Sequence, residues 1–387
     1  MNTDRLQRYP RQGPSSDNVL QRLLGMRAAI GITRVADITG LDRIGIPVMQ
    51  AVRPHSLSNA VSQGKGSTPE AAAISAIFEC AESCFAERLD RYQSFLATPR
   101  SLELEPEAFA YHRWEPPRDD WLDKNMPWIR AWELLTDHAA AIPLELVHTA
   151  YVAQPTGDDD GFVQATTGLA AAFRKEDAVV HGILECVERD AVARAAATHG
   201  FFQKNRIDVT SIDDPVIIAL LGRLREMDMI AALWSVPSAA GIPVVWCQLL
   251  EAEESGATYL SYPADGSAAA FDPAAALYHA VLEAAQCRLA AISGARDDIT
   301  RAAYPKYPDY ARWRSHRKFL LSQRQVIDLR CLPHVECEAK NCQTALLEKL
   351  RSCGIRTVLA AGIDTAPLHE LSVVKVIIPE LRPLLEG

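Results

Sequence analysis

Apolar and polar positions recur along the chain with two different periods, which predicts both helices and strands. Residues 19–29 repeat their apolar positions with the period of a helix, whereas residues 33–38 alternate as a strand does. A turn at residues 39–42 leads into a second extended apolar stretch, residues 46–52, and together these segments predict an antiparallel hairpin.

The same patterns predict the secondary structure of the rest of the chain. Further strands are expected at residues 144–153, 230–234, 243–250, 259–262, 357–360 and 372–378. Residues 345–353 form an amphipathic helix that Gly354 should end. The combination indicates an α+β fold with mixed or antiparallel sheets onto which the helices pack.

The distribution of polar residues suggests the domain organisation. Residues 1–18 are polar and lack the apolar core of a secretion signal, so we interpret them as a flexible arm before a single catalytic domain, residues 19–387. Within that domain, residues 90–121 are expected to be an irregular excursion and residues 326–387 a βαβ-like segment. Three aspartates in the loop at residues 154–161 are interpreted as turn residues rather than metal ligands.

Composition excludes several classes of function. The chain has 387 residues, 48% of them hydrophobic, and can bury a substantial core. Its net charge of -9 argues against nucleic acid as a partner, because phosphate binding needs clustered Lys and Arg. The sequence contains no apolar run of membrane-spanning length, so we expect a cytoplasmic protein without membrane contact.

Nine cysteines are scattered along the chain and are expected to be mostly buried thiols, as is usual in a reducing cytosol. The tightest group is Cys331, His334, Cys337 and Cys342. A structural zinc site is the alternative for this group, but we disfavour it because the usual pair of closely spaced cysteines is missing.

The most informative feature is a segment that occurs three times. In each copy a glycine-containing stretch, expected to be a turn, precedes a helix with polar residues at positions i, i+4 and i+7. The three stretches are residues 64–69, 168–173 and 266–271. The polar residues that follow are Ser75, Glu79 and Glu82 in the first copy, His181, Glu185 and Glu188 in the second, and His279, Glu283 and Gln286 in the third.

This spacing places the polar residues of each copy on one stripe of a helix, bordered by apolar residues. Carboxylates at the edge of a buried face need a cation. Magnesium fits, because it prefers carboxylate oxygens and binds together with substrate phosphates. The glycine turns would offer N–H groups to phosphate, and Lys65 would add a positive charge.

A simpler interpretation exists for each part of the repeat. One pair of glutamates three residues apart is usually a solvated helix face, and His181 or His279 taken alone is more often a packing residue than a base. Three copies in one register make coincidence improbable. Their shared register favours both histidines as residues that line the same pocket.

These motifs closely resemble those of the YcaO family over about residues 31–379. The family's first motif, S-x-x-x-E-x-x-E-R, corresponds to Ser75, Glu79 and Glu82, with Ser83 in place of the arginine. The second corresponds to Glu185, Glu188, Arg189 and Asp190, and the third to Glu283, Gln286 and Arg288, followed by residues 293–298. Residues 32–34 and 40–47 are similar to the family's N-terminal hairpin.

The resemblance implies that ATP and Mg2+ are the cofactors and that the acidic helices bind them. The implied metal ligands are Glu79, Glu82, Glu185, Glu188 and Glu283. The implied nucleotide contacts, beyond these acids, are Lys65, Ser75, Arg189, Gln286 and Arg288. His181, His279 and Arg296 are candidates only for lining the pocket, and Arg88 is a candidate replacement for the arginine missing at Ser83.

The resemblance also implies the reaction, in which a nucleophile adds to a peptide amide, ATP phosphorylates the resulting oxyanion, and phosphate leaves. Azoline-forming members use a Cys, Ser or Thr side chain of the substrate and end in a proline-rich tail. This chain ends with only Pro379 and Pro383, outside any P-x-P pattern. Its motifs look more like those of members that work beside a TfuA protein and install a thioamide from a sulfur nucleophile.

We therefore favour thioamide formation on a peptide or protein substrate, with a TfuA-type partner for sulfur delivery or leader binding. Formation of an azoline by cyclodehydration is the alternative within the enzyme class. A non-catalytic scaffold that binds a peptide or partner is the alternative from another class, and Ser83 keeps it open. Modification of a ribosomal protein is a weaker alternative, and a homodimer is a candidate assembly.

Overall fold

The structure is a computed structural model that describes residues 16–151, 161–252, 260, 262–295, 309–338 and 340–383. Its helices are α1 (Ser16–Ile30), α2 (Pro69–Ala86), α3 (Lys175–Ala197), α4 (Phe201–Lys204), α5 (Pro215–Glu226), α6 (Pro273–Ser293), α7 (Tyr310–Ser322) and α8 (Cys342–Ser352). Its strands are β1 (Arg34–Asp37), β2 (Val48–Val52), β3 (Val61–Lys65), β4 (Ser94–Ala97), β5 (Met126–Glu133), β6 (His138–Pro143), β7 (Leu169–Ala172), β8 (Met229–Val236), β9 (Val244–Glu251), β10 (Ala264–Ala269), β11 (Leu359–Ile363) and β12 (Ser372–Ile377).

The strands form three sheets, and every pairing between these named strands is antiparallel. Two sheets have three strands, in the orders β1-β2-β3 and β10-β9-β8. The third has the order β4-β5-β11-β12-β7, with β6 paired to β5. The predicted α+β fold with antiparallel sheets is confirmed, and so is the hairpin, because β1 pairs with β2 from Arg34 opposite Val52 onward.

Each copy of the repeat is a strand followed by a helix, and the strand lies at the edge of its sheet. β3 leads into α2, β7 into α3 and β10 into α6. The sequence explains two of the helix starts, because Thr68 and Asp272 accept hydrogen bonds from the first-turn N–H groups and a proline follows each of them.

The expectation that all three glycine stretches are turns is wrong for two of them. Gly64 lies in β3 and Gly266 in β10. A β-carbon at Gly64 would lie 2.0 Å from the backbone nitrogen of Ala76, and one at Gly266 would lie 2.2 Å from that of Ala284. Glycine is required there because the strand backbone packs directly on the helix backbone. Gly168, which has a φ of +81°, does form a turn before β7.

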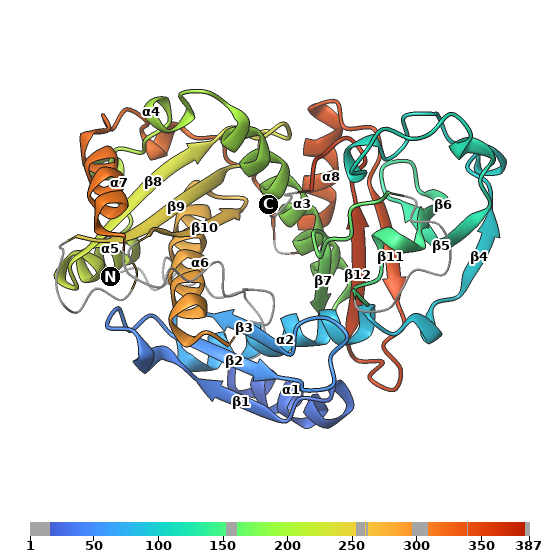
Figure 1. Ribbon diagram of the computed structural model, residues 1–387, viewed down its shortest axis with the longest axis horizontal. Helices are drawn as coiled ribbons and strands as arrows, with labels where there is room; N and C mark the ends of the chain where they lie inside the picture. Colours follow the sequence, from blue (N-terminus) through green and yellow to red (C-terminus); the bar gives the residue numbers. More distant parts are fainter. Residues whose placement is uncertain are drawn as a thin grey trace.

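The three helices also pack in a cycle. Beyond its own strand, α2 contacts β7, α3 contacts β10 and α6 contacts β3, so each acidic helix reaches the edge strand of another copy. Figure 1 shows α2, α3 and α6 around the middle of the molecule, with β4, β5 and β6 at one end. This arrangement brings segments more than 100 residues apart into one region.

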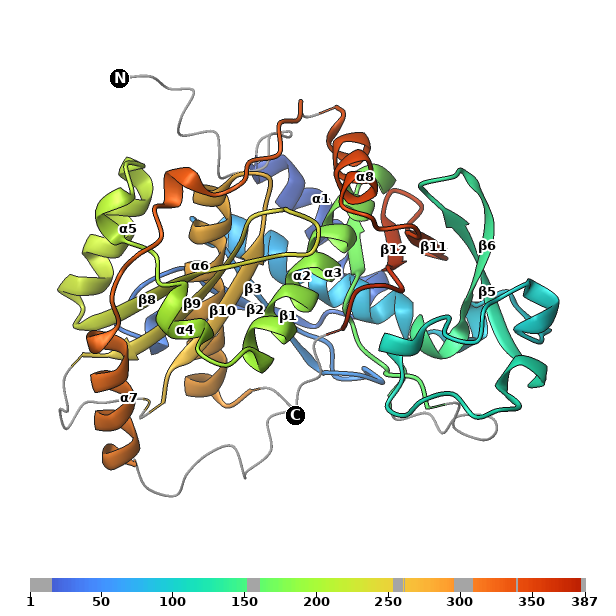
Figure 2. The same cartoon turned by 90° about the horizontal axis from the view of Figure 1, so that it is seen from above.

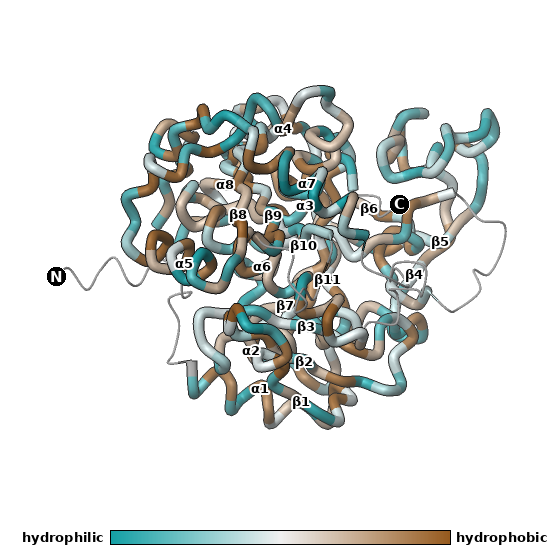
Figure 3. Tube along the Cα trace, turned by 60° about the vertical axis from the view of Figure 1, so that its left-hand side comes forward, coloured by the Kyte–Doolittle hydropathy of each residue, from teal (hydrophilic) through white to brown (hydrophobic). Residues whose placement is uncertain are grey.

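Each acidic helix is the centre of its own apolar cluster. Ile77 of α2, Ile183 of α3 and Val281 of α6 are fully buried in three separate clusters. In Figure 3 the loops at the periphery are mostly hydrophilic, whereas apolar stretches run through the interior elements. The apolar face of each helix therefore fixes it to its sheet and leaves its polar stripe directed toward the next copy.

Several sequence predictions need correction. Residues 144–151 form no strand and begin with the 3-10 turn Leu144–Leu146, because the apolar side chains there pack inward from a turn. Leu260 and Tyr262 are not in a strand either, and the strand of that region is β10. Before α8, the residues near position 327 make only an isolated bridge, so the C-terminal segment has the order α8-β11-β12.

The irregular excursion contains one strand, β4, and otherwise short 3-10 turns. Seen from above in Figure 2, α5 and α7 lie at one end of the molecule and β5 and β6 at the other. α1 begins at Ser16, within the predicted arm. Residues 1–15 of that arm, the three aspartates of the loop at residues 154–161, and Arg296 lie outside the described residues.

Candidate functional site

The site begins with Glu283, in the middle of α6. One of its carboxylate oxygens lies 2.6 Å from the ammonium nitrogen of Lys65, at the end of β3, and the other lies 4.0 Å from the guanidinium of Arg189 on α3. Burial acts to raise the pKa of Glu283, but Lys65 and Arg189 outweigh it and hold that pKa below its usual value. Glu283 is therefore a carboxylate at neutral pH.

Arg189 connects Glu283 with the acids of its own helix. Its guanidinium lies 3.6 Å from Glu185 and 3.6 Å from Glu188. Glu185 also accepts a hydrogen bond of 3.1 Å from the N–H of Gly168, at the turn before β7. Three glutamates of two helices thus meet around one guanidinium.

Glu188 is the most buried of these acids. Burial raises its pKa to about 7, and the negative charge of Glu283 adds to the effect while Arg189 opposes it. Its carboxylate accepts a hydrogen bond of 2.7 Å from the hydroxyl of Ser267 on β10. Glu188 is therefore partly protonated at neutral pH, and a cation placed beside it would favour the ionised carboxylate.

The last polar residue of each copy forms a hydrogen bond with the strand of another copy. Glu82 accepts a hydrogen bond of 2.8 Å from the N–H of Ala171 on β7, as Glu188 does from Ser267. In the third copy Gln286 donates its amide to the carbonyl oxygen of Gln63 at 2.7 Å. A carbonyl acceptor needs a donor, which an ionised glutamate lacks, so the local geometry explains the glutamine.

The α2 copy is more open than the other two. Glu79 is exposed, and Ser75 and Glu82 are half-buried on the same helix. Glu82 is bonded to Ala171 of β7. The turn directly before β7 is bonded to Glu185 through the N–H of Gly168, so both acids contact the same short segment. The structure therefore forms one connected set of residues. Its side chains in direct contact are those of Lys65, Arg189, Glu185, Glu188 and Glu283. Glu82 and Gln286 join the set through their bonds to β7 and β3, and Glu79 and Ser75 lie on the same helix as Glu82.

Arg288 does not belong to this set. Its guanidinium is only 1% exposed and pairs with Asp42 at 2.8 Å and with Glu251 at 2.9 Å. These partners tie α6 to the N-terminal hairpin and to β9. The sequence predicts a nucleotide contact for Arg288, and in this structure its guanidinium is paired with these two buried acids.

The remaining candidates have separate surroundings. His181 and His279 are half-buried one helical turn before the acids of α3 and α6, and His279 stacks edge-on against Tyr278. Arg88 donates to the carbonyl oxygens of Ala29 and Ala366, so it does not replace the arginine missing at Ser83.

The cysteine group of the C-terminal segment shows no convergent ligand set. The sulfur atoms of Cys337 and Cys342 lie 2.7 Å apart, whereas His334 lies beside Asp272. In the described ranges, no three His, Cys, Asp or Glu side chains are close enough to ligate a metal in this conformation.

Comparison with known proteins identifies the family. The family profile described as YcaO cyclodehydratase, ATP- and Mg2+-binding, matches residues 63–382. This chain belongs to the YcaO family. A relative from Methanothermobacter thermautotrophicus, an uncharacterized protein, is 32% identical over 91% of this chain and 90% of its own length.

Solved structures and a second relative support the assignment. YcaO from Methanopyrus kandleri, bound with AMPPCP and Mg2+, has the same fold, with a TM-score of 0.72, 22% identity and coverage of 95% of this chain and 91% of that one. A heterocyclase in complex with substrate and cofactor matches with a TM-score of 0.75 and 20% identity, covering 98% of this chain and 55% of that one. A Rhizobium leguminosarum protein described as lying in the tfuA 3' region is 29% identical over 92% of this chain and 85% of its own length.

The family match confirms ATP and Mg2+ as the cofactors, since YcaO proteins are ATP-dependent, peptide-modifying enzymes. The donor types of this YcaO chain fit the metal. The carboxylates of Glu185, Glu188 and Glu283 lie around Arg189, so three acids of two helices are available to a cation. Carboxylate oxygens are also the ligands that magnesium prefers.

Sequence reasoning missed three features of this YcaO chain. Ser267 was assigned to a turn, although its hydroxyl binds Glu188 from β10. Asp42 was assigned only to a turn, although it pairs with Arg288. Lys375 was not noticed, although a lysine in the otherwise apolar strand β12 is the signal that could have revealed it.

In the described part of the chain, no helix combines the length and the apolar character that a membrane crossing requires.

Proposed function

We propose that this YcaO chain uses ATP and Mg2+ to activate a backbone amide of a peptide or protein. The observation that carries the proposal is the set of acids from α3 and α6 around Lys65 and Arg189, with Glu82 of α2 bonded to the neighbouring strand β7. ATP, when bound, would supply a phosphoryl group that makes the amide oxygen a good leaving group, and Mg2+ would neutralise the charge of the phosphates.

We assign the residues of the set to two tasks. Glu82, Glu185, Glu188 and Glu283 would hold magnesium, together with the exposed Glu79 from the middle of the α2 stripe. Lys65 and Arg189 would contact phosphate oxygens. Each is now paired with a glutamate, and when a metal binds that glutamate the cation becomes available to phosphate. Ser75 and Gln286 lie beside the set and would contact the nucleotide.

Thioamide formation is the product that we favour. In that reaction hydrosulfide forms the new carbon–sulfur bond, the amide oxygen leaves as part of hydrogen phosphate, and ATP becomes ADP. One observation supports this choice, because the relative from Rhizobium leguminosarum is described by its place beside tfuA. A TfuA-type protein is accordingly the proposed partner.

Cyclodehydration of a Cys, Ser or Thr is the second candidate. It is supported by the description of the family as cyclodehydratase and by the fold shared with a heterocyclase. It uses the same activated amide but takes the nucleophile from the substrate. The two candidates therefore differ in the product and not in the acidic site.

Calorimetry tests the acidic site. We expect AMPPCP to bind the wild-type chain only with Mg2+, and we expect Glu188→Gln and Glu283→Gln each to weaken binding by about tenfold or more, since each removes a charge-assisted contact. Glu348→Gln is the matched control, because Glu348 is exposed on α8, outside the set. Absence of binding at millimolar nucleotide would favour a non-catalytic scaffold.

Mass spectrometry tests the product. The chain is incubated with ATP, Mg2+, sodium sulfide and each short peptide encoded next to its gene. Replacement of oxygen by sulfur in a peptide supports thioamide formation. Loss of one water in the absence of sulfide would instead establish cyclodehydration and refute our preferred product.

A further inference from the structure

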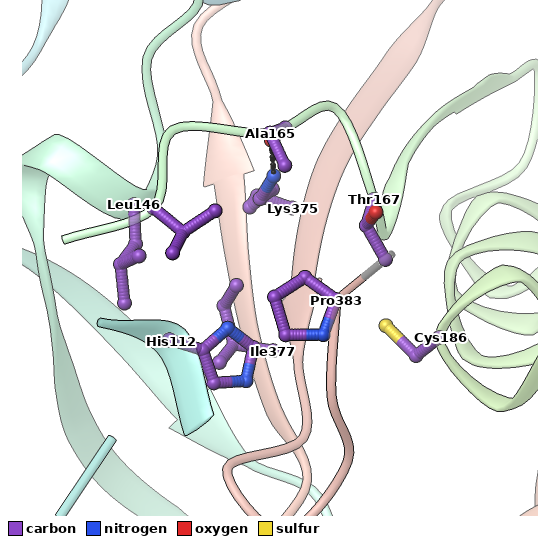
Figure 4. Close-up of a pocket in the computed structure, with 9 residues that line it drawn as sticks. His112, Leu146, Ala165, Thr167, Cys186, Lys375, Ile377 and Pro383 are labelled. Carbon is purple, nitrogen blue, oxygen red and sulfur yellow. Dashed lines mark hydrogen bonds between the residues drawn. The ribbon is translucent and has the colours of Figure 1, made fainter. Parts of the chain in front are cut away.

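A small cavity lies beside the acidic set, on the other side of the turn that precedes β7. Figure 4 shows the side chains that line it. They come from β12, α3, the segment before β7, the C-terminal segment and two 3-10 turns that carry His112 and Leu146. The cavity measures about 10 Å³, the size that accommodates one water molecule or one ion of similar radius.

Lys375 gives the cavity a buried positive charge. Its side chain is only 1% exposed, and its ammonium nitrogen donates to the carbonyl oxygen of Ala165. An ammonium has three donors. Among the described residues Lys375 forms no ion pair, and the charge of Glu185 acts on it only from a distance, through no direct contact.

The histidines near the cavity respond to the charge of Lys375. Burial lowers the pKa of Lys375 to about 8, which still leaves the ammonium protonated at neutral pH. Burial lowers the pKa of His112 to about 4 and also lowers that of His148, and the charge of Lys375 contributes in both cases. Among the charged groups nearby, Glu185 acts in the opposite direction.

A cation that is buried without an ion-pair partner lowers the free energy of unfolding, because its charge is removed from water. An anion bound beside it would offset this desolvation penalty. The volume of the cavity suits a monatomic or similarly small anion better than phosphate or a peptide carboxylate. Its walls also suit a weakly hydrated anion, because Leu146, Val163 and Ile377 are apolar while Thr167 can donate a hydroxyl.

The cavity is connected to the acidic set through two segments. Cys186 of its lining directly follows Glu185, and Thr167 directly precedes Gly168, whose N–H binds Glu185. We propose that the cavity binds a small monovalent anion, and that in the thioamide-forming reaction proposed above this anion is hydrosulfide. The identity of the anion rests on that proposed function, whereas the binding site does not.

Bromide is the probe for the site, because it is a small monovalent anion that anomalous X-ray diffraction locates. Crystals of the full chain are soaked in sodium bromide. We expect a peak within hydrogen-bonding distance of the Lys375 ammonium in the wild type, no peak there in Lys375→Met, and an unchanged peak in Lys349→Met, a control on α8. A cavity without bromide in the wild type, or with bromide in Lys375→Met, would overturn the proposal.

Kinetics with sulfide test the identity of the anion. Loss of a charge-assisted hydrogen bond should raise the KM for sulfide by about tenfold or more in Lys375→Met, with unchanged affinity for AMPPCP. Thr167→Val should raise it by a smaller factor and serves as an independent variant. An unchanged KM in both would refute hydrosulfide at this site. Bromide binding without any sulfur product would retain the anion site and refute the thioamide proposal.

Discussion

Replacement of Gly266 by alanine tests how the acidic helix α6 is positioned. The added β-carbon would lie 2.2 Å from the backbone nitrogen of Ala284 and 2.4 Å from the carbonyl oxygen of Ala280. Both atoms belong to the helix backbone, which cannot move aside as a flexible side chain can. β10 and α6 would have to separate by about 1 Å to reach ordinary van der Waals contact.

The cost of this separation can be estimated. Overpacking of a tight interior typically costs about 1–3 kcal/mol. Alanine recovers about 0.4–1 kcal/mol through the lower entropy of the unfolded chain. We therefore expect Gly266→Ala to reduce the free energy of unfolding by about 1–2 kcal/mol. Because Glu283 moves with α6, its contact with Lys65 should lengthen and the affinity for AMPPCP with Mg2+ should fall.

Urea unfolding followed by circular dichroism measures the effect, and calorimetry measures nucleotide affinity. Gly222→Ala is the matched control, because Gly222 lies within α5 and its β-carbon would meet nothing within 4 Å. Alanine there should stabilise the protein by about 0.5–1 kcal/mol. If Gly266→Ala were as stable as Gly222→Ala, direct packing of strand on helix would be refuted.

Three further substitutions have defined outcomes. Gln286→Glu should destabilise the protein by about 1–3 kcal/mol in urea unfolding, because a carboxylate cannot donate to the carbonyl of Gln63. Arg288→Met should cost about 3–5 kcal/mol, because it leaves two buried carboxylates without their shared cation. Lys375→Met should stabilise the protein at pH 7 by up to about 3 kcal/mol, since burial lowers the lysine pKa from 10.5 to about 8.

The sign of the last effect follows from proton binding. Above pH 10.5 the lysine is neutral in both the folded and the unfolded chain, whereas below pH 8 folding must bury its charge. Wild-type stability should therefore rise between pH 8 and 10.5, and that rise should disappear in Lys375→Met. A rise of equal size in the variant would show that another group causes it. Likewise, Gln286→Glu at wild-type stability would contradict the role assigned to its amide.

The sequence by itself determined which helices carry the acids. The spacing of Glu185 and Glu188, and of Glu283 and Gln286, fixes them on one helical stripe because side-chain direction in a helix depends only on local geometry. The resemblance of these motifs to the YcaO family then indicated the cofactors, and the match over residues 63–382 confirmed them.

The tertiary structure alone decided what those residues contact. That Lys65 meets Glu283, that Ser267 meets Glu188 and that Gln286 meets a carbonyl group all depend on the cyclic packing of three helices on the edge strands of other copies. No local pattern encodes such pairings, because they join residues far apart in the chain. The same holds for Arg288, whose motif indicated a nucleotide contact while packing buried it between two acids.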